Sequence, residues 1–320
     1  MKVQEELGAS SLGTAHTGRS NRQLVWARFR GDKAAVSGLI LVSFIAAVAI
    51  FAPLIAKLTG HTPNQLFRYT RTGLGLPAGP SAHFWFGADQ VGRDLFVRVI
   101  YGARTSLFVA VVGTTLATLL GVFVGLLSGY HGGRVDTVIS RVIDVWLSLP
   151  LLLFAVGLST VCSAAVHGCL GGLLQPGLPL VTGIIVLFTW PYLTRIVRGQ
   201  VISLREREFV EAARSIGASD ARIMFSEVLP NIMAQILVYA TLTIPGNILF
   251  EASLSFLGVG VPQSTPSWGR MLSDATSGSL FTYAWWMMVY PGLFLLVTTL
   301  AFYLVGDGVL DAMDPRRRAR

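Results

Sequence analysis

Residues 145–194 read VWLSLPLLLFAVGLSTVCSAAVHGCLGGLLQPGLPLVTGIIVLFTWPYLT, and none of these fifty positions carries a charged side chain. A helix that crosses a membrane needs about 20 mostly apolar residues, because the hydrocarbon core is about 30 Å thick and each residue advances about 1.5 Å. The run is therefore long enough for two crossings. The Gly- and Pro-rich stretch 168–179 inside it is where we expect the chain to turn.

Uncharged stretches recur on both sides of this run. Hydrophobic residues make up 52% of the chain and charged residues only 13%, whereas about 25% of an average soluble domain is charged. The composition therefore excludes an ordinary soluble fold and indicates an all-α membrane protein with about six transmembrane helices. The expected spans are about 34–56, 106–129, 142–161, 180–197, 228–250 and a last span ending near Val305.

The excess of basic residues, +8 in net charge, lies mainly next to the expected spans and not on a separate basic domain. This placement points to a membrane and away from nucleic acid. Lys and Arg near span ends are retained on the cytoplasmic side, so both termini and the segment 200–230 are predicted to be cytoplasmic. Arg68, Arg71, Arg93, Arg98 and Arg104 oppose this orientation, but they fall in or beside a long loop, where the rule is weak.

The spans divide the chain into five regions. We expect a polar arm at 1–33 whose first twenty residues lack fixed structure, and then a first span at 34–58 that is too long for a signal sequence and acts as an anchor. An outer segment, 59–103, follows and is expected to be helical from Gly92 to Tyr101. The transmembrane core is 104–308, with a tight inner loop at 130–141, and the tail is 309–320.

The two cysteines, Cys162 and Cys169, fall in the expected outer turn after the third span. An oxidising compartment allows a disulfide there. Two unpaired thiols beside a turn of small residues fit the sequence equally well.

The inner segment 203–230 reads SLREREFVEAARSIGASDARIMFSEVLP. We expect a helix from Ser203 to Ile216, with Glu211 spaced to face Arg207 and Arg214. Gly217 suits a left-handed C-terminal cap, and Ser219 or Asp220 can cap a second helix. A protruding corner with small side chains suits docking into a partner, but composition alone leaves a solvated loop equally open.

Part of this segment resembles a known motif. Glu211-Ala212-Ala213, then Gly217 after three residues, then Leu229-Pro230 resemble the EAA loop of binding-protein-dependent ABC importers. Glu227 departs from the motif, which has an aliphatic residue at that position.

The resemblance narrows to the C-subunit type of dipeptide and oligopeptide permease and covers nearly all of the chain from Phe86 onward. The matching positions are 86–94, 98 and 101–107, then 129–133, 136, 141 and 144, then 251, 254–258, 266, 268, 269, 271 and 272, and finally 306–308, 311, 314 and 315. The first eighty-five residues match only in kind, as a basic arm followed by a span.

The resemblance implies a type I ABC importer permease fold in the bacterial cytoplasmic (inner) membrane. It implies a second, usually non-identical permease subunit, two cytoplasmic subunits that bind ATP and Mg, an extracellular or periplasmic substrate-binding protein, and a peptide as cargo. The chain itself would be a non-catalytic subunit without a cofactor or metal. By carry-over, the residues expected to contact the ATPase are Phe209, Val210, Glu211, Ala212, Ala213, Arg214 and Gly217.

Two acidic residues stand at the margins of expected spans, where a charge is unfavourable unless it is paired or faces a cavity. Asp144 is expected either to pair with Arg141 or to line a pathway. Glu251 follows a span interrupted at Pro245-Gly246, so a structural and a pathway role are equally open.

Other function classes find little support. The chain lacks the G-x-x-x-x-G-K-[ST] phosphate loop, a metal-ligand spacing among its histidines and a Ser-His-Asp constellation. An ion-coupled secondary transporter would need Asp144 or Glu251 as its coupling acid, and a polytopic membrane enzyme would need clustered catalytic side chains. Within the importer family, nickel complexes, glutathione or another small solute are alternative cargoes.

Overall fold

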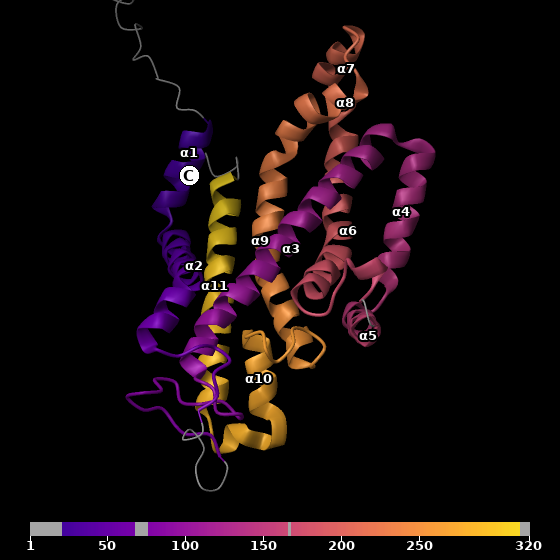
Figure 1. Cartoon of the computed structure of the whole chain (residues 1–320). Coiled ribbons are helices and arrows are strands. Elements are labelled where there is room, and N and C mark those ends of the chain that lie inside the picture. The colour runs from indigo at the N-terminus through magenta and orange to yellow at the C-terminus, as the bar shows by residue number, and fades with distance from the viewer. Residues whose placement is uncertain (1–20, 68–75, 166–167, 314–320) are drawn as a thin grey trace, which may run out of the picture.

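A computed structural model of the chain describes residues 21–67, 76–165 and 168–313. In these ranges the protein is helical, apart from connecting loops and two isolated bridges (Figure 1). In chain order, the helices up to residue 204 are α1 (Asn21–Gly31), α2 (Lys33–Thr59), α3 (Leu95–His131), α4 (Gly133–Ser148), α5 (Leu151–Ala164) and α6 (Leu178–Leu204). They are followed by α7 (Glu208–Ser215), α8 (Asp220–Arg222), the π-helical turn η3 (Ile223–Val228), α9 (Leu229–Phe256), α10 (Trp268–Thr276) and α11 (Trp286–Met313). Short 3-10 turns η2 (Leu170–Gly172) and η4 (Ser277–Thr282) lie between them.

Five helices in the described part of the chain are long and apolar enough to cross a membrane, and a bent pair brings the count to six. The five are α2, α3, α6, the continuous helix Asp220–Phe256 and α11. The prediction of an all-α membrane protein with about six spans is therefore confirmed.

The third predicted span, over 142–161, is made of two helices, α4 and α5, which meet at an angle of 87° and count as a span only as a bent pair. Leu149 precedes Pro150 and is extended, with φ −75° and ψ 132°. A residue before proline is disfavoured in the helical region, and proline has no N–H to continue the ladder, so the helix ends there.

The two ends of α3 differ from the prediction. The inner loop over 130–141 is wrong, because α3 ends at His131 and α4 begins at Gly133 after a one-residue turn at Gly132. Gly132 has φ 64° and ψ −154°, which glycine adopts readily. The outer helix expected at 92–101 is not separate either, since α3 runs unbroken from Leu95 through the second span.

Two other boundaries also differ. The single helix expected over 203–216 is divided, because α6 ends at Leu204 and α7 begins at Glu208. The fifth span begins earlier than residue 228, since its helix starts at Asp220, and the last helix continues past 308 to Met313. Residues 21–31 of the predicted polar arm form α1, and the first twenty residues lie outside the described part of the chain.

Glycines on α3 allow close packing against α6. A Cβ atom added at Gly125 would lie 2.7 Å from Val197 Cβ, and one added at Gly129 would lie 2.7 Å from Val201 Cβ. Gly113 and Gly121 face α6 in the same way. Small residues let two helix backbones approach within a membrane, where packing stabilises association. Helices α3 and α6 therefore pack closely along much of their length.

The bundle has two distinct ends (Figure 1). Helices α1 and α7 and the C-terminal end of α11 lie at one end, which we call the α7 end, and α10 lies at the other, the α10 end. At the start of α2, the Asp32 side chain accepts hydrogen bonds from the backbone N–H groups of Ala34 and Ala35. Arg28 and Arg30, in the last turn of α1, and Lys33, the first residue of α2, lie on either side of this cap.

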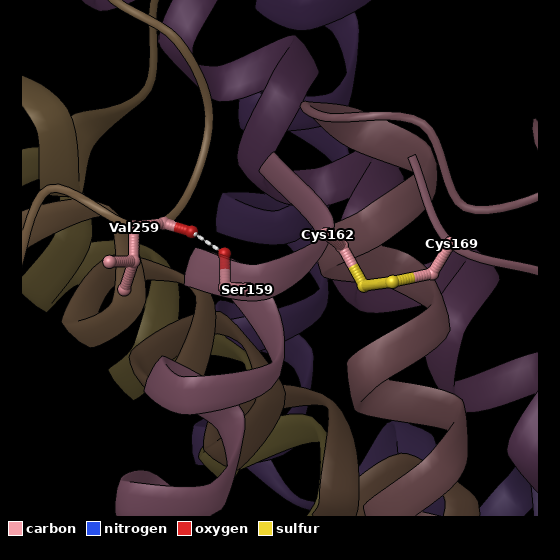
Figure 2. Close-up of a disulfide and its surroundings, with 4 residues drawn as sticks. All are labelled: Ser159, Cys162, Cys169 and Val259. Atoms are coloured by element: carbon pink, nitrogen blue, oxygen red, sulfur yellow. Dashed lines mark hydrogen bonds between the residues drawn. A yellow bond between two sulfur atoms is a disulfide. The ribbon is translucent and has the colours of Figure 1, made fainter. Parts of the chain in front are cut away.

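A disulfide joins Cys162 of α5 to Cys169, which lies just before η2 (Figure 2). The structure thus selects the disulfide over the free thiols that the sequence also allowed. One turn earlier on α5, the Ser159 hydroxyl donates a hydrogen bond to the carbonyl oxygen of Val259, in the loop after α9 (Figure 2). Helix α5 is therefore joined by a disulfide to the turn that leads into α6 and by a hydrogen bond to the loop after α9.

Candidate functional site at the α7 end

Helix α7 packs against the bundle mainly through Val210, with Ala213 half-buried against the same cluster. Val210 is completely buried and belongs to an apolar cluster that includes Tyr130 of α3, Val201 of α6 and Ile223 of η3. The break between α6 and α7 makes this contact available, because it turns α7 back onto the cluster. Apart from the partly exposed Phe209, the remaining residues of α7 are polar or small, so the helix is amphipathic with a single buried stripe.

The turn after α7 is a Schellman motif. The Gly217 N–H donates to the Arg214 carbonyl at 3.0 Å, and the Ala218 N–H donates to the Ala213 carbonyl at 3.1 Å. These two bonds satisfy carbonyls that the helix end leaves free. Gly217 has φ 79°, as predicted, whereas a Cβ atom there would meet nothing within 4 Å. The position thus requires glycine for its backbone conformation and not for lack of space.

The second half of the corner is capped as the sequence predicted. The Ser219 side chain accepts a hydrogen bond from the backbone N–H of Arg222, at the start of α8. The hydroxyl of Tyr130 on α3 donates to Asp220 Oδ1 at 2.8 Å, and the Arg214 guanidinium carbon lies 5.9 Å from the centre of the Tyr130 ring. Tyr130 of α3 therefore contacts residues on both sides of the turn, Arg214 of α7 and Asp220 of α8.

The predicted pairing of Glu211 is not formed. No salt bridge joins Glu211 to Arg207 or Arg214 in this fully described segment. Glu211 and Ala212 are exposed and Ala213 is half-buried. The Glu211 carboxylate is thus free to meet a partner.

The exposed face of the corner is partly apolar. Ile216, immediately before the cap glycine, is 82% exposed, and Phe209 is 38% exposed. Ile216 was missed in the sequence, although an isoleucine beside a cap glycine in an otherwise polar helix is a usable signal. We call Phe209, Glu211, Ala212 and Ile216 the corner surface; it combines apolar and acidic groups on a rigid base.

The base beneath the corner is held by charged side chains. Asp136 of α4 accepts from Ser128 Oγ at 2.6 Å and from an Arg198 terminal nitrogen at 2.7 Å. Arg205, just after α6, donates to the Gly129 carbonyl at 3.2 Å. These contacts fix the end of α6, and hence the start of α7, to the turn between α3 and α4.

Asp144 does not pair with Arg141 as expected. Its carboxylate accepts from Arg195 of α6, and both side chains are about half exposed, at 50% and 52%. An exposed pair of this kind contributes about 0–1 kcal/mol. The pair links α4 to α6 on the surface of the chain.

Glu251 is completely buried near the α10 end. Its carboxylate accepts from Ser106 Oγ of α3 and from Ser255 Oγ of α9, each at 2.8 Å. Within the described ranges, no salt bridge reaches Glu251. The residue joins two helices inside the protein, which favours the structural role among those that the sequence left open.

A second buried charge cluster at the α10 end was not predicted. Arg93 donates to Asp89 Oδ2 at 2.5 Å, and Arg98, which is fully buried, reaches the same oxygen at 3.5 Å and the Gln263 carbonyl at 3.2 Å. Burial raises the pKa of the Asp274 carboxyl on α10, and neighbouring arginines oppose that shift. The cluster ties the outer segment to α10.

The described residues contain no group of three or more His, Cys, Asp or Glu side chains placed to hold a metal ion.

Residues 121–319, well over half of the chain, match the family described as "Binding-protein-dependent transport system inner membrane component". Residues 20–72 match the "N-terminal TM domain of oligopeptide transport permease C".

Curated relatives agree with this match over almost the whole chain. The "Oligopeptide transport system permease protein OppC" of Bacillus subtilis is 39% identical over 291 residues, which cover 91% of this chain and 88% of the relative. The "Dipeptide transport system permease protein DppC" of the same organism is 38% identical over 93% of this chain and 87% of its own length. The "Di/tripeptide transport system permease protein DppC" of Pseudomonas aeruginosa is 37% identical over 91% of each chain. The spans, the corner at 208–222 and these similarities together place the chain in the family of binding-protein-dependent ABC importer permeases, as a multi-pass inner-membrane subunit of the OppC/DppC type.

Proposed function

We propose that this permease subunit passes dipeptides or oligopeptides inward across the cytoplasmic membrane, and that partner ATPase subunits drive it through the corner surface. The observation that carries the proposal is the contrast within α7. Val210 is fully buried, whereas Ile216 is 82% exposed at the tip. A rigid base with an exposed apolar tip is suited to transmit motion of a bound partner to α3, α6 and α9.

The chemistry of the corner favours a protein groove as the binding partner. Ala212 and Ala213 allow close approach, Phe209 and Ile216 supply apolar area, and Glu211 supplies a charge for the rim of the contact. Buried apolar anchors surrounded by polar groups are typical of protein interfaces. Arg214 and Gly217 then act mainly within the corner, on Tyr130 and on the turn.

The proposed assembly holds two permease subunits, the second non-identical, because one chain supplies one such corner. Two cytoplasmic subunits bind ATP and Mg and hydrolyse the nucleotide, and a periplasmic or extracellular binding protein delivers the cargo. Both termini and the α7 end face the cytoplasm. The basic residues beside α2 support this orientation, as does the disulfide, which requires an oxidising compartment.

Peptide is the preferred cargo because the relatives are named as oligopeptide, dipeptide and di/tripeptide permeases. The match of residues 20–72 to the N-terminal region of an oligopeptide permease supports the same branch. Nickel, glutathione and other small solutes are therefore less favoured.

The test is uptake of a radiolabelled dipeptide by proteoliposomes that contain the whole complex, with ATP enclosed. We expect Glu211→Trp and Ile216→Asp to lower uptake by at least about tenfold, since each disrupts a close protein contact. Insertion of the chain should be unchanged, because neither side chain is buried. Arg141→Trp, on exposed α4, is the control for adding a bulky side chain. Normal uptake by both corner variants would contradict the proposed coupling.

A further inference from the structure

A groove of about 620 Å³ is lined mainly by α2 and α3, and α9 and α11 each contribute one residue to it. Its lining includes Val42, Ala46 and Ile50 from α2 and Leu107, Phe108 and Val111 from α3. Ile244 and Phe302 contribute from α9 and α11. One charged residue, Arg104, also lines it, and all the other lining residues are apolar.

Arg104 lies on the side of α3 that faces away from the protein interior. Gly102 packs against Trp268 of α10, and Ser106 donates to the buried Glu251. Positions 102 and 106 are each about 200° around the helix from position 104, because successive residues are about 100° apart. Arg104 is accordingly exposed, and among the described residues it makes no salt bridge.

The position of Arg104 along α3 matches the edge of the hydrocarbon core. It immediately precedes the uncharged run 105–133, so it stands where the apolar part of the helix begins. Leu107, Phe108 and Val111 follow three, four and seven residues later, on the same helix face. The groove therefore leads from one positive charge at the interface into a purely apolar channel.

We propose that this groove binds one phospholipid, with the lipid phosphate on the Arg104 guanidinium and an acyl chain between α2 and α3. A charged side chain at a membrane-facing position is costly unless it finds a partner, and a guanidinium binds phosphate oxygens in a bidentate manner. The apolar walls offer an acyl chain favourable burial. They offer no hydrogen-bond partner to the amides of a peptide, so the cargo does not fit this groove.

The experiment uses the purified complex in a phosphate-free detergent, stripped of lipid and then titrated with phosphatidylglycerol. Native mass spectrometry counts the lipids that remain on the permease subunit. We expect one tightly held lipid, with apparent affinity lowered roughly tenfold in Arg104→Gln, since a charge-assisted contact is lost. Arg104→Lys should retain most of the binding. Ala46→Trp, which fills the channel, should remove the lipid while Arg104 remains.

Two control variants separate the site from general effects. Arg141→Gln removes an equal charge from exposed α4, and Val145→Trp introduces the same tryptophan at a position that is 66% exposed and lies outside the groove. Both should bind lipid like the parent complex. Equal lipid affinity in the parent and in Arg104→Gln would overturn the proposal.

Other ligands give different results. Saturable binding of inorganic phosphate that competes with the lipid and persists in Ala46→Trp would assign Arg104 to a free anion and overturn the lipid site. Loss of the second permease from the Arg104→Gln complex, with an unchanged lipid count on the remaining chain, would assign Arg104 to a subunit contact. These readouts do not depend on uptake, so they stand or fall separately from the proposed transport function.

Discussion

The Tyr130 hydroxyl on the last turn of α3 lies 2.8 Å from Asp220 Oδ1, at the start of the helix that follows the corner. This bond connects α3 to the segment proposed to meet the ATPase. Removing it with Tyr130→Phe should cost about 0.5–1.5 kcal/mol of local stability, the usual net contribution of one hydrogen bond. We expect faster amide hydrogen exchange over 208–222, with little change elsewhere.

Asp220→Asn is the matched variant for this bond, because the asparagine amide oxygen still accepts from the tyrosine hydroxyl. Its exchange rates should fall between those of the parent protein and Tyr130→Phe. If both variants exchange like the parent, the Tyr130 bond does not stabilise the corner.

Val210 is the anchor of α7, so truncating it should release the corner. Burying a valine side chain contributes roughly 1.5–3 kcal/mol, and Val210→Ala removes most of that contribution. We expect trypsin to cut faster after Arg207 and Arg214, measured in the intact complex by the rate of fragment formation. Ala212→Ser, on the exposed side of the same helix, is the control and should be cut at the parental rate. Equal rates in the two variants would show that α7 is held by something other than Val210.

Substitutions at Gly217 test whether the turn requires glycine for its backbone conformation or for lack of space. Because its φ is 79° and its surroundings are open, Gly217→Ala should cost about 1 kcal/mol through the backbone alone. Gly217→Asn should cost less, since asparagine tolerates the left-handed region. The measurement is stimulation of ATP hydrolysis by the binding protein and peptide, which should decline in the order Gly, Asn, Ala, Val. A valine variant with full stimulation would show that the Schellman turn is not needed for coupling.

Most of the fold follows from hydrophobic runs, because a membrane span needs about 20 apolar residues and little else. The run at 34–56 therefore located α2 to within about three residues, whereas the run at 105–133 located the end of α3 but not its start at Leu95. The bend within the third span was not predicted, because apolar length does not report backbone direction. Pro150 was the visible sign of the bend, but the angle depends on how α5 packs against α6 and the loop after α9.

In the candidate site, too, local features were predicted from the sequence and contacts between different helices were not. The left-handed cap at Gly217 and the Ser219 cap are local properties, so sequence reasoning located both. The partners of Asp144 and Glu251 are not local, since Arg195 and Ser106 come from other helices. Tertiary packing decides such contacts, and charge spacing on a single helix therefore named the wrong partner for Asp144.

Glu251 should act as a structural link near the α10 end. Glu251→Ala leaves the Ser106 and Ser255 hydroxyls without their acceptor and opens a cavity, so we expect a loss of roughly 2–5 kcal/mol. Glu251→Gln keeps the shape and one acceptor oxygen and should lose less. Thermal unfolding of the complex, followed by the exposure of buried tryptophan, gives the ranking. A glutamine variant as unstable as the alanine variant would mean that the charge itself, and not the acceptor geometry, is required.

The Cys162–Cys169 disulfide allows one experiment on both redox state and sidedness. The two cysteines are seven residues apart, so the bond closes a short loop, and its removal by a double Cys→Ser change should cost about 2–3 kcal/mol. In intact cells with a permeabilised outer layer, a membrane-impermeant maleimide should label these cysteines only after reduction and only from outside. A cysteine introduced at exposed Ser215, in the Cys-free background, should label only in inverted vesicles. Labelling of Cys162 or Cys169 without reductant would contradict the disulfide, and labelling at position 215 from outside would reverse the proposed orientation of the α7 end.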